Sequence, residues 1–328
     1  MEILHYCPAG VVTGGTESIH KLVSEFNRID GVHARILYRG LNVTNPQPKE
    51  YEKYGCEYIA EGLDERSAFP EGFKGVVIFP EIWGNMVIDP LYKDCVTAIN
   101  WAGVDVYDWN VPFHDRGLFL KNKGTIHLAQ LDYAVDHLKK LGVTEIYRIS
   151  DVLNDDFFEP YVEEQRNNTI LYNPTPAKMT KFQHTVIQRC ITEKGMKFQP
   201  LEGLTREQLI NNMRHSKLYI DFGVFSGRER LPREAAMCGC CVITSNSGAA
   251  GYYTDLSIPN KYKFNNDVND FDSVFRAIQM IELVLGCYNY CSVDFIGYRD
   301  SIIEDRKNLP EQCKIVCRRF KELCQDSV

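Results

Sequence analysis

The chain has 328 residues, of which 44% are hydrophobic and 25% are charged, and its net charge is −7 at pH 7. This length exceeds one ordinary domain and the composition is that of a globular protein, so we expect two domains of about 150 residues each. The acidic balance excludes a broad electrostatic grip on nucleic acid, although it leaves a local basic groove open.

The start of the chain does not look like a leader sequence. Met1 is followed by Glu2 and a strand-like run rather than by a basic segment and an apolar one. No apolar run approaches the roughly 20 residues that a membrane span needs. We therefore expect a cytoplasmic protein without a transmembrane segment, and peripheral contact with a membrane stays open. The 12 cysteines are scattered, and we expect them to be reduced thiols.

The first half of the chain alternates apolar runs with helical patterns. Residues 2–7 predict a buried strand, and Gly14 and Gly15 then lead into an amphipathic helix. A strand, a glycine loop and a helix in this order are typical of nucleotide-binding sites, but the glycines do not have the G-x-G-x-x-G or P-loop spacing. Two roles for these glycines therefore stay open: they form a tight turn between strand and helix, or they let the backbone approach a ligand closely. Further strands are predicted at 34–38, 75–80, 96–101, 125–130 and 145–150, and a helix at 132–141.

A polar stretch at 151–168 separates these elements from a second series of the same kind. Because the apolar runs do not alternate strictly and helices separate them, they indicate parallel sheets that are covered on both faces. The sequence thus predicts an α/β protein with two Rossmann-like, doubly wound domains facing each other across a cleft. The second series has strands at 169–173, 197–201, 217–222 and 262–264, a turn and helix at 174–190, and helices at 205–215 and 271–285.

The stretch from 221 to 251 carries the clearest chemistry. A loop follows the strand that ends near Asp221, and Pro232 then suits the first position of a short helix. Helix N–H groups and arginines directed at one spot favour an anion, while the carboxylate of Glu234 suits hydroxyl groups. A ligand with both phosphate and sugar accounts for the two together. The loop and the helix contain three arginines: Arg228, Arg230 and Arg233.

On these motifs the chain resembles the retaining glycosyltransferases of the GT-B architecture, in particular the family 4 group. Residues 232–243 (PREAAMCGCCVI) are similar to the family's signature, and residues 247–251 (SGAAG) to the glycine turn that follows it. Residues 14–17 (GGTE) are similar to the family's N-terminal glycine loop. The resemblance implies an acceptor-side domain at 1–160, a donor-binding domain at 161–300 and a C-terminal helix at 301–328 that crosses back to the first domain.

The resemblance also implies roles for individual residues. Glu234 corresponds to a glutamate that holds the donor ribose, and Lys178 to a lysine that binds the diphosphate. Ser226 departs from the family, because a second glutamate is expected there, so Asp221 or Glu229 is a candidate for holding the sugar. The expected donor-binding set is Gly14, Gly15, Lys178, Arg228, Arg230, Glu234 and Gly248. The expected catalytic set is Glu229, Asp221 and Glu81, of which Glu81 is chosen because it follows a strand.

The expected activity is transfer of a sugar from a nucleoside diphosphate sugar to a hydroxyl of a glycan or lipid-linked glycan, with retention and without a metal or cofactor. Asp270 and Asp272 spell the D-x-D of another glycosyltransferase fold, but their place before a helix favours capping. Two alternatives stay open: a non-catalytic nucleotide-sugar-binding protein and a sugar-nucleotide epimerase. A modified nucleic-acid base is the alternative acceptor, although the acidic charge makes nucleic acid an unlikely partner.

Overall fold

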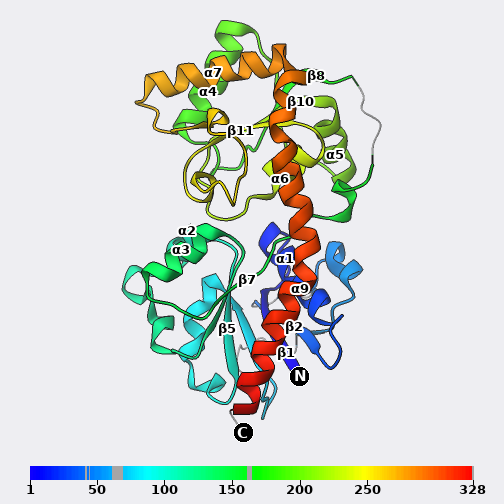
Figure 1. Ribbon diagram of the computed structural model, residues 1–328, viewed down its shortest axis with the longest axis vertical. Helices are drawn as coiled ribbons and strands as arrows, with labels where there is room; N and C mark the ends of the chain where they lie inside the picture. The colour runs from blue at the N-terminus through cyan, green and yellow to red at the C-terminus, as the bar shows by residue number, and fades with distance from the viewer. Residues whose placement is uncertain (41–42, 44, 61–68, 161–164, 327–328) are drawn as a thin grey trace. The chain divides into compact units, whose positions relative to one another are not determined.

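The computed structural model describes residues 1–40, 43, 45–60, 69–160 and 165–326 (Figure 1). The chain divides into two compact units. The first consists of Met1–Val152 together with Asp305–Val328, and the second of Leu153–Glu304. The long helix α9 (Ile296–Asp326) therefore contributes residues to both units. Within the predicted separating stretch, residues 161–164 lie outside the described residues.

The first unit is built on a parallel sheet of seven strands in the order β3-β2-β1-β4-β5-β6-β7. Its central strands are buried along their whole length, as expected when helices cover both faces of a parallel sheet. The two-residue edge strand β3 was not predicted. The strands are β1 (Glu2–Pro8), β2 (His33–Arg39), β3 (Tyr58–Ile59), β4 (Val76–Pro80), β5 (Val96–Trp101), β6 (Ile126–Ala129) and β7 (Ile146–Arg148).

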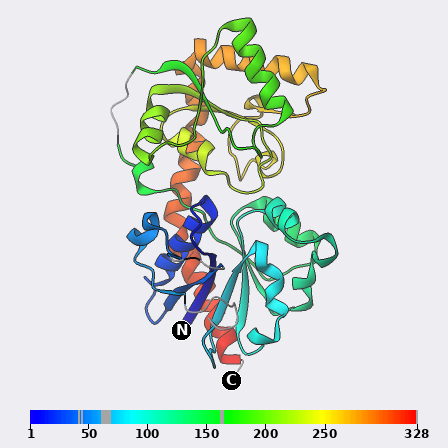
Figure 2. The ribbon, with the colours of Figure 1, turned by 180° about the vertical axis from the view of Figure 1, so that it is seen from behind.

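Alternating residues of this sheet form two cores. On one face, Val76 and Ile78 pack in a cluster with α1 (Gly14–Phe26) and with Cys313 and Phe320 of α9. The views from opposite sides show the C-terminal part of α9 running along this sheet (Figures 1 and 2). The other face is aromatic: the ring of Phe79 stacks on Tyr6 at a centroid distance of 5.0 Å. Helices α2 (Val104–Asn110) and α3 (Asp132–Lys140) complete the unit.

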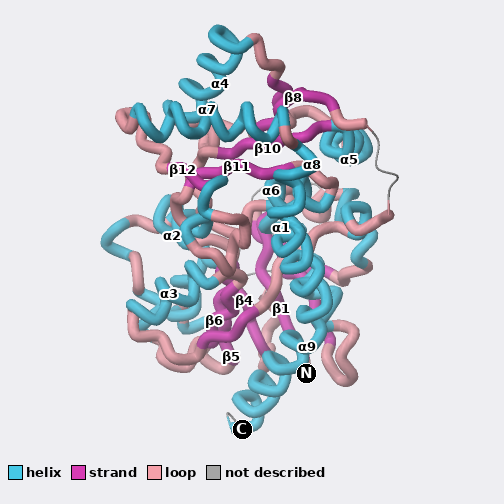
Figure 3. The backbone as a smooth tube through the Cα atoms, turned by 45° about the horizontal axis from the view of Figure 1, so that its top comes forward, coloured by secondary structure: helices cyan, strands magenta, loops and turns pink. Residues whose placement is uncertain are grey.

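The second unit is built on a parallel sheet of five strands in the order β12-β11-β10-β8-β9. Helix α4 packs beside α7 and helix α5 beside α6, and both α6 and α7 contact β10 (Figure 3). The strands are β8 (Asn167–Tyr172), β9 (Phe198–Pro200), β10 (Ser216–Asp221), β11 (Cys241–Ser245) and β12 (Lys263–Phe264). The helices are α4 (Lys181–Lys194), α5 (Arg206–His215), α6 (Arg230–Met237), α7 (Phe271–Gly286) and α8 (Tyr288–Ser292). The predicted α/β class with two parallel sheets is therefore confirmed.

The local signals at helix ends were read correctly in several places. Thr205 and Gln208 form the predicted capping box of α5, and Gly239 follows α6 with a φ of +91°. Asp270 caps α7 by accepting a hydrogen bond from the backbone N–H of Ser273 at 2.9 Å. The start of α6 was placed too late. The helix begins at Arg230, and Pro232 occupies its third position, where the missing N–H still has no intrahelical acceptor.

Short 3-10 helices link these elements. Among the described helices, none combines the length and the apolar character that crossing a lipid bilayer requires. All 12 cysteines are free thiols, and most of them are buried, as expected. The 3-10 helices are η1 (Lys49–Tyr54), η2 (Glu81–Ile88), η3 (Pro90–Tyr92), η4 (Phe113–Asp115), η5 (Leu118–Lys121), η6 (Asp155–Phe157), η7 (Ala249–Gly251), η8 (Asn260–Tyr262) and η9 (Val293–Phe295).

Candidate functional site

The strand order of each sheet marks one place where a ligand is expected. In open parallel sheets, ligands bind beyond the carboxyl ends of the strands where the strand order reverses. In the second sheet this point lies between β8 and β10, because the chain passes from β8 to β9 on one side and then to β10 on the other. In the first sheet it lies between β1 and β4. The loops after these four strands therefore form the candidate sites.

Lys178 lies in the loop after β8, three residues before α4 begins. We had predicted a turn and helix that carries this lysine. Its side chain is only 7% exposed. The Nζ atom donates to the carbonyl oxygen of Val224 at 2.6 Å and lies 3.0 Å from Oε1 of Glu229. It also lies 4.5 Å from the centre of the Phe225 ring. The switch point of the second sheet thus holds an enclosed cation, which a surface lysine would not provide.

Gly223 makes this arrangement possible, and sequence reasoning missed it. A Cβ atom at this position would lie 2.4 Å from Cδ and 2.8 Å from Cα of Lys178. Neither distance is sterically possible, so only glycine lets the loop after β10 approach the Lys178 backbone this closely. The available signal was a glycine two residues after the strand end at Asp221.

Asp221 ends β10 and is fully buried. Its carboxylate accepts hydrogen bonds from the backbone N–H of Gly223 at 3.0 Å and from the hydroxyl of Tyr219 at 3.2 Å. Burial raises the pKa of Asp221 to about 6, although the positive charge of Lys178 opposes this rise. The negative charge of Glu229 adds to it. Asp221 is therefore a carboxylate that is tied to the loop and that can titrate near neutral pH.

Glu229 immediately precedes α6, and its side chain is 24% exposed. Its Oε1 atom accepts a hydrogen bond from Oγ of Ser226 at 3.5 Å, the position at which the sequence resemblance led us to expect a glutamate. Arg233 fixes the backbone of this turn, because its fully buried guanidinium donates to the carbonyl oxygens of Arg228 and Glu229. We expected Arg233 to face an anion, but these contacts give it a positioning role within the loop.

The remaining donor-binding candidates of this unit lie around α6. Arg228 and Glu234 are buried, and Arg230 is half-buried as the first residue of the helix. Gly248 has a φ of +60° and forms a parallel bridge with Phe225, which ties the glycine turn after β11 to the loop that surrounds Lys178. The structure thus places these predicted residues in neighbouring loops and in the first turns of α6.

The glycine loop of the first unit lies at the switch point of its own sheet. Gly14 and Gly15 are the first two residues of α1, where backbone N–H groups have no intrahelical acceptor. Thr13 caps the helix, and its N–H donates to Oγ1 of Thr16 at 3.0 Å and to the hydroxyl of Tyr51 at 3.0 Å. The helix start is therefore fixed by these hydrogen bonds, and its first two residues carry no side chains.

Glu81 follows β4 at the same switch point and is buried. Its two carboxylate oxygens accept hydrogen bonds from the backbone N–H groups of Ala102 at 3.3 Å and Gly103 at 3.1 Å. Burial raises the pKa of Glu81 to about 7, although these hydrogen bonds oppose the rise. The carboxylate thus links the loop after β4 to the loop after β5, which is a structural contact. The catalytic role of Glu81 stays a prediction.

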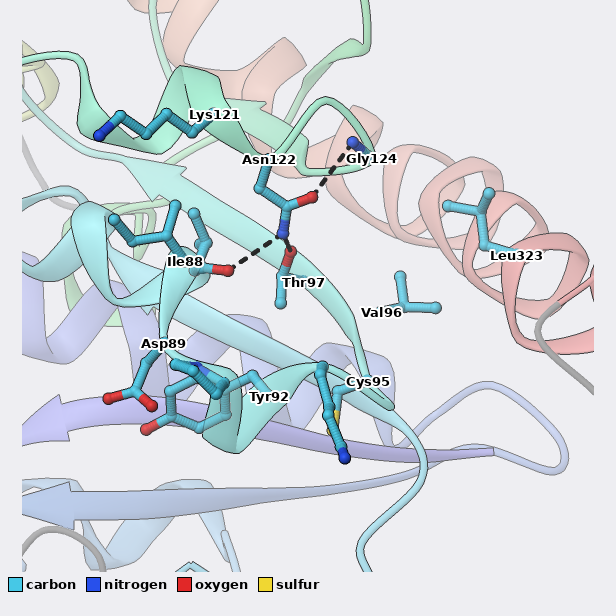
Figure 4. A pocket seen from close by; sticks show the side chains of 13 residues that line it. Ile88, Asp89, Tyr92, Cys95, Val96, Thr97, Lys121, Asn122, Gly124 and Leu323 are labelled. Carbon is cyan, nitrogen blue, oxygen red and sulfur yellow. Dashed lines mark hydrogen bonds between the residues drawn. The ribbon is translucent and has the colours of Figure 1, made fainter.

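A separate pocket of about 610 Å³ lies at the opposite edge of the first sheet (Figure 4). Val96, the first residue of β5, is part of its wall. Asn122 also lines the pocket, and its side-chain amide donates hydrogen bonds to Oγ1 of Thr97 at 3.2 Å and to the carbonyl oxygen of Val87 at 3.0 Å. Because this is the amino-terminal edge of the strands, it is not where a nucleotide is expected. In the described part of the chain, no group of three or more histidine, cysteine or acidic side chains is arranged for a metal ion.

Comparisons with known proteins agree with this architecture. No protein-family model matches the chain. An α-1,6-glucosyltransferase of Actinobacillus pleuropneumoniae serotype 7 (strain AP76) is 27% identical over 195 residues, which are 58% of this chain and 55% of that protein. The chain thus spans little more than half of that relative's length.

Solved structures match over almost the whole chain. Sucrose-phosphate synthase from Thermosynechococcus elongatus is 11% identical with a TM-score of 0.71, and the match covers 98% of this chain and 100% of that one. Anabaena HepE in complex with UDP and glucose is 9% identical with a TM-score of 0.69 and the same coverage. At these identities the likeness concerns the fold alone. The chain therefore has the GT-B fold of glycosyltransferases, as the sequence predicts.

Proposed function

We propose that the protein is a glycosyltransferase that moves a sugar from a nucleoside diphosphate sugar to a hydroxyl of a glycan acceptor. The observation that carries this proposal is the cluster at the switch point of the second sheet. There an enclosed lysine and two carboxylates lie at the carboxyl ends of β8 and β10, beside a helix start that carries arginines. Cationic groups suit a departing diphosphate, and carboxylates suit sugar and ribose hydroxyls.

In the proposed reaction, the bond between the sugar C1 and the diphosphate oxygen breaks, and a bond from C1 to the acceptor oxygen forms. Lys178, Arg228 and Arg230 stabilise the negative charge of the departing diphosphate, and Glu234 holds the ribose. The acceptor oxygen attacks C1 on the face from which the diphosphate departs, which gives retention, and its proton passes to a phosphate oxygen on that face; no metal takes part. Asp221 or Glu229 holds the sugar, and Glu81 remains the candidate of the first unit.

A glucose donor is the first choice, because the curated relative is named a glucosyltransferase and HepE is found with UDP and glucose. The test is a thermal-shift screen with UDP, GDP and ADP and their glucose conjugates, followed by donor hydrolysis and NMR of the product anomer. A ligand at about 100 times its Kd adds about 2.7 kcal/mol of stability. Binding without hydrolysis or transfer would favour the non-catalytic alternative, and conversion of the donor sugar without an acceptor would favour the epimerase.

A further inference from the structure

The enclosed ammonium of Lys178 already has an anionic partner in this structure. Oε1 of Glu229 lies 3.0 Å from Nζ, and the lysine side chain is 7% exposed. Its other near neighbours are the Val224 carbonyl oxygen and the Phe225 ring, which surround the ammonium. A diphosphate that is to contact Lys178 therefore has to reach an ammonium that is already paired with a carboxylate.

Adding a diphosphate to this cluster would be electrostatically unfavourable as long as Glu229 stays in place. Asp221 also acts on Lys178, so two carboxylates already share the neighbourhood of one ammonium. In a partly buried site, the repulsion between these carboxylates and further negative charge at short range is strong. We propose that Glu229 is an internal counter-ion of Lys178 that the diphosphate of the donor displaces, so that one anion replaces the other. This inference rests on the proposed function.

Glu229, rather than Asp221, is the carboxylate that can leave. Asp221 is fully buried and is held by the Gly223 N–H and the Tyr219 hydroxyl. The Glu229 side chain is 24% exposed and makes no capping hydrogen bond to α6. A rotation of its side chain takes the carboxylate into water, while Arg233 keeps the Glu229 backbone in place. The released carboxylate is then available to a hydroxyl of the donor sugar.

The proposed exchange predicts that one substitution in the site raises the affinity for UDP instead of lowering it. Glu229→Gln keeps the size of the side chain and removes the competing charge, so UDP should bind more tightly. A glutamate that simply held the ligand would give the opposite result. Glu282 provides a matched control, because it pairs with Lys194 at 2.8 Å in an exposed ion pair of the same unit. Glu282→Gln makes the same change in net charge away from the switch point.

The experiment is calorimetric titration of UDP, GDP and ADP into the wild-type protein, Glu229→Gln and Glu282→Gln at one pH and low salt. The expected result is a Kd about tenfold lower for Glu229→Gln, the change that 1.4 kcal/mol produces, with Glu282→Gln within twofold of wild type. Glu229→Ala should also bind more tightly, and it serves as the test if Glu229→Gln does not fold. An unchanged or higher Kd in the folded Glu229 variant would overturn the counter-ion role while leaving the proposed function in place. No binding of any of the three nucleotides by all proteins would overturn both.

Discussion

The backbone of Gly223 lies so close to Lys178 that a Cβ atom on the glycine would be 2.4 Å from Cδ of the lysine. The two residues come from the loops after β10 and β8, the two strands that flank the switch point of the second sheet. Their contact brings the loop with Glu229 over the lysine. The geometry of the candidate donor site therefore depends on a residue that has no side chain.

Gly223→Ala should disturb this site directly. The added methyl group forces either the loop or Lys178 to move, which we expect to cost about 1–3 kcal/mol of stability, as for other overpacked sites. The displaced lysine should also weaken UDP binding. Thermal unfolding and calorimetry measure the two effects. Gly297→Ala is the control, because no atom lies within 4 Å of a Cβ there and the position is exposed. Wild-type UDP affinity in Gly223→Ala would show that the Lys178 position does not matter.

Glu234→Ala and Arg230→Ala should each weaken nucleotide binding while the fold stays intact. Hydrogen bonds to charged groups contribute about 1.5–3 kcal/mol, so a loss of about 10- to 100-fold in UDP affinity is expected from each change. Arg276→Ala serves as the control, since Arg276 forms an exposed i,i+4 pair with Asp272 on α7. Circular dichroism checks the fold. If calorimetry gave wild-type affinity in both variants, the ligand would not lie beside α6.

The sequence predicted the sheets better than it predicted the site. Apolar runs at β4, β5 and β10 identified the parallel strands, because burial on both faces requires continuous hydrophobic residues. Sequence spacing could not show that Lys178 and Glu229, which are far apart in the chain, form an ion pair at 3.0 Å. Nor could it show that Arg233 binds backbone carbonyls, since its spacing is equally compatible with a ligand contact.

Activity should survive EDTA. The proposed reaction uses Lys178, Arg228 and Arg230 to neutralise the diphosphate. Chelation of divalent ions should therefore leave the rate within about twofold of that of the untreated enzyme, which is far less than the tenfold change that about 1.4 kcal/mol of activation free energy produces. Asp270 accepts a hydrogen bond from Ser273, and Asp272 pairs with Arg276 at 2.8 Å. Asp270→Asn and Asp272→Asn should therefore keep activity. Loss on chelation with rescue by manganese, together with inactive aspartate variants, would contradict a metal-free reaction.

Glu81 should make the stability of the protein depend on pH in a specific direction. Burial raises its pKa from 4.5 to about 7, so the native state holds the proton more tightly than the unfolded chain does. This contribution is complete below pH 4.5 and is lost as the pH rises through 7. Over this window the free energy of unfolding should fall by up to about 3 kcal/mol relative to Glu81→Gln, which cannot titrate. Urea unfolding of both proteins at pH 4.5, 5.5, 6.5 and 7.5 measures the difference. Parallel curves for the two proteins would show that burial does not raise the pKa of Glu81 in the native state.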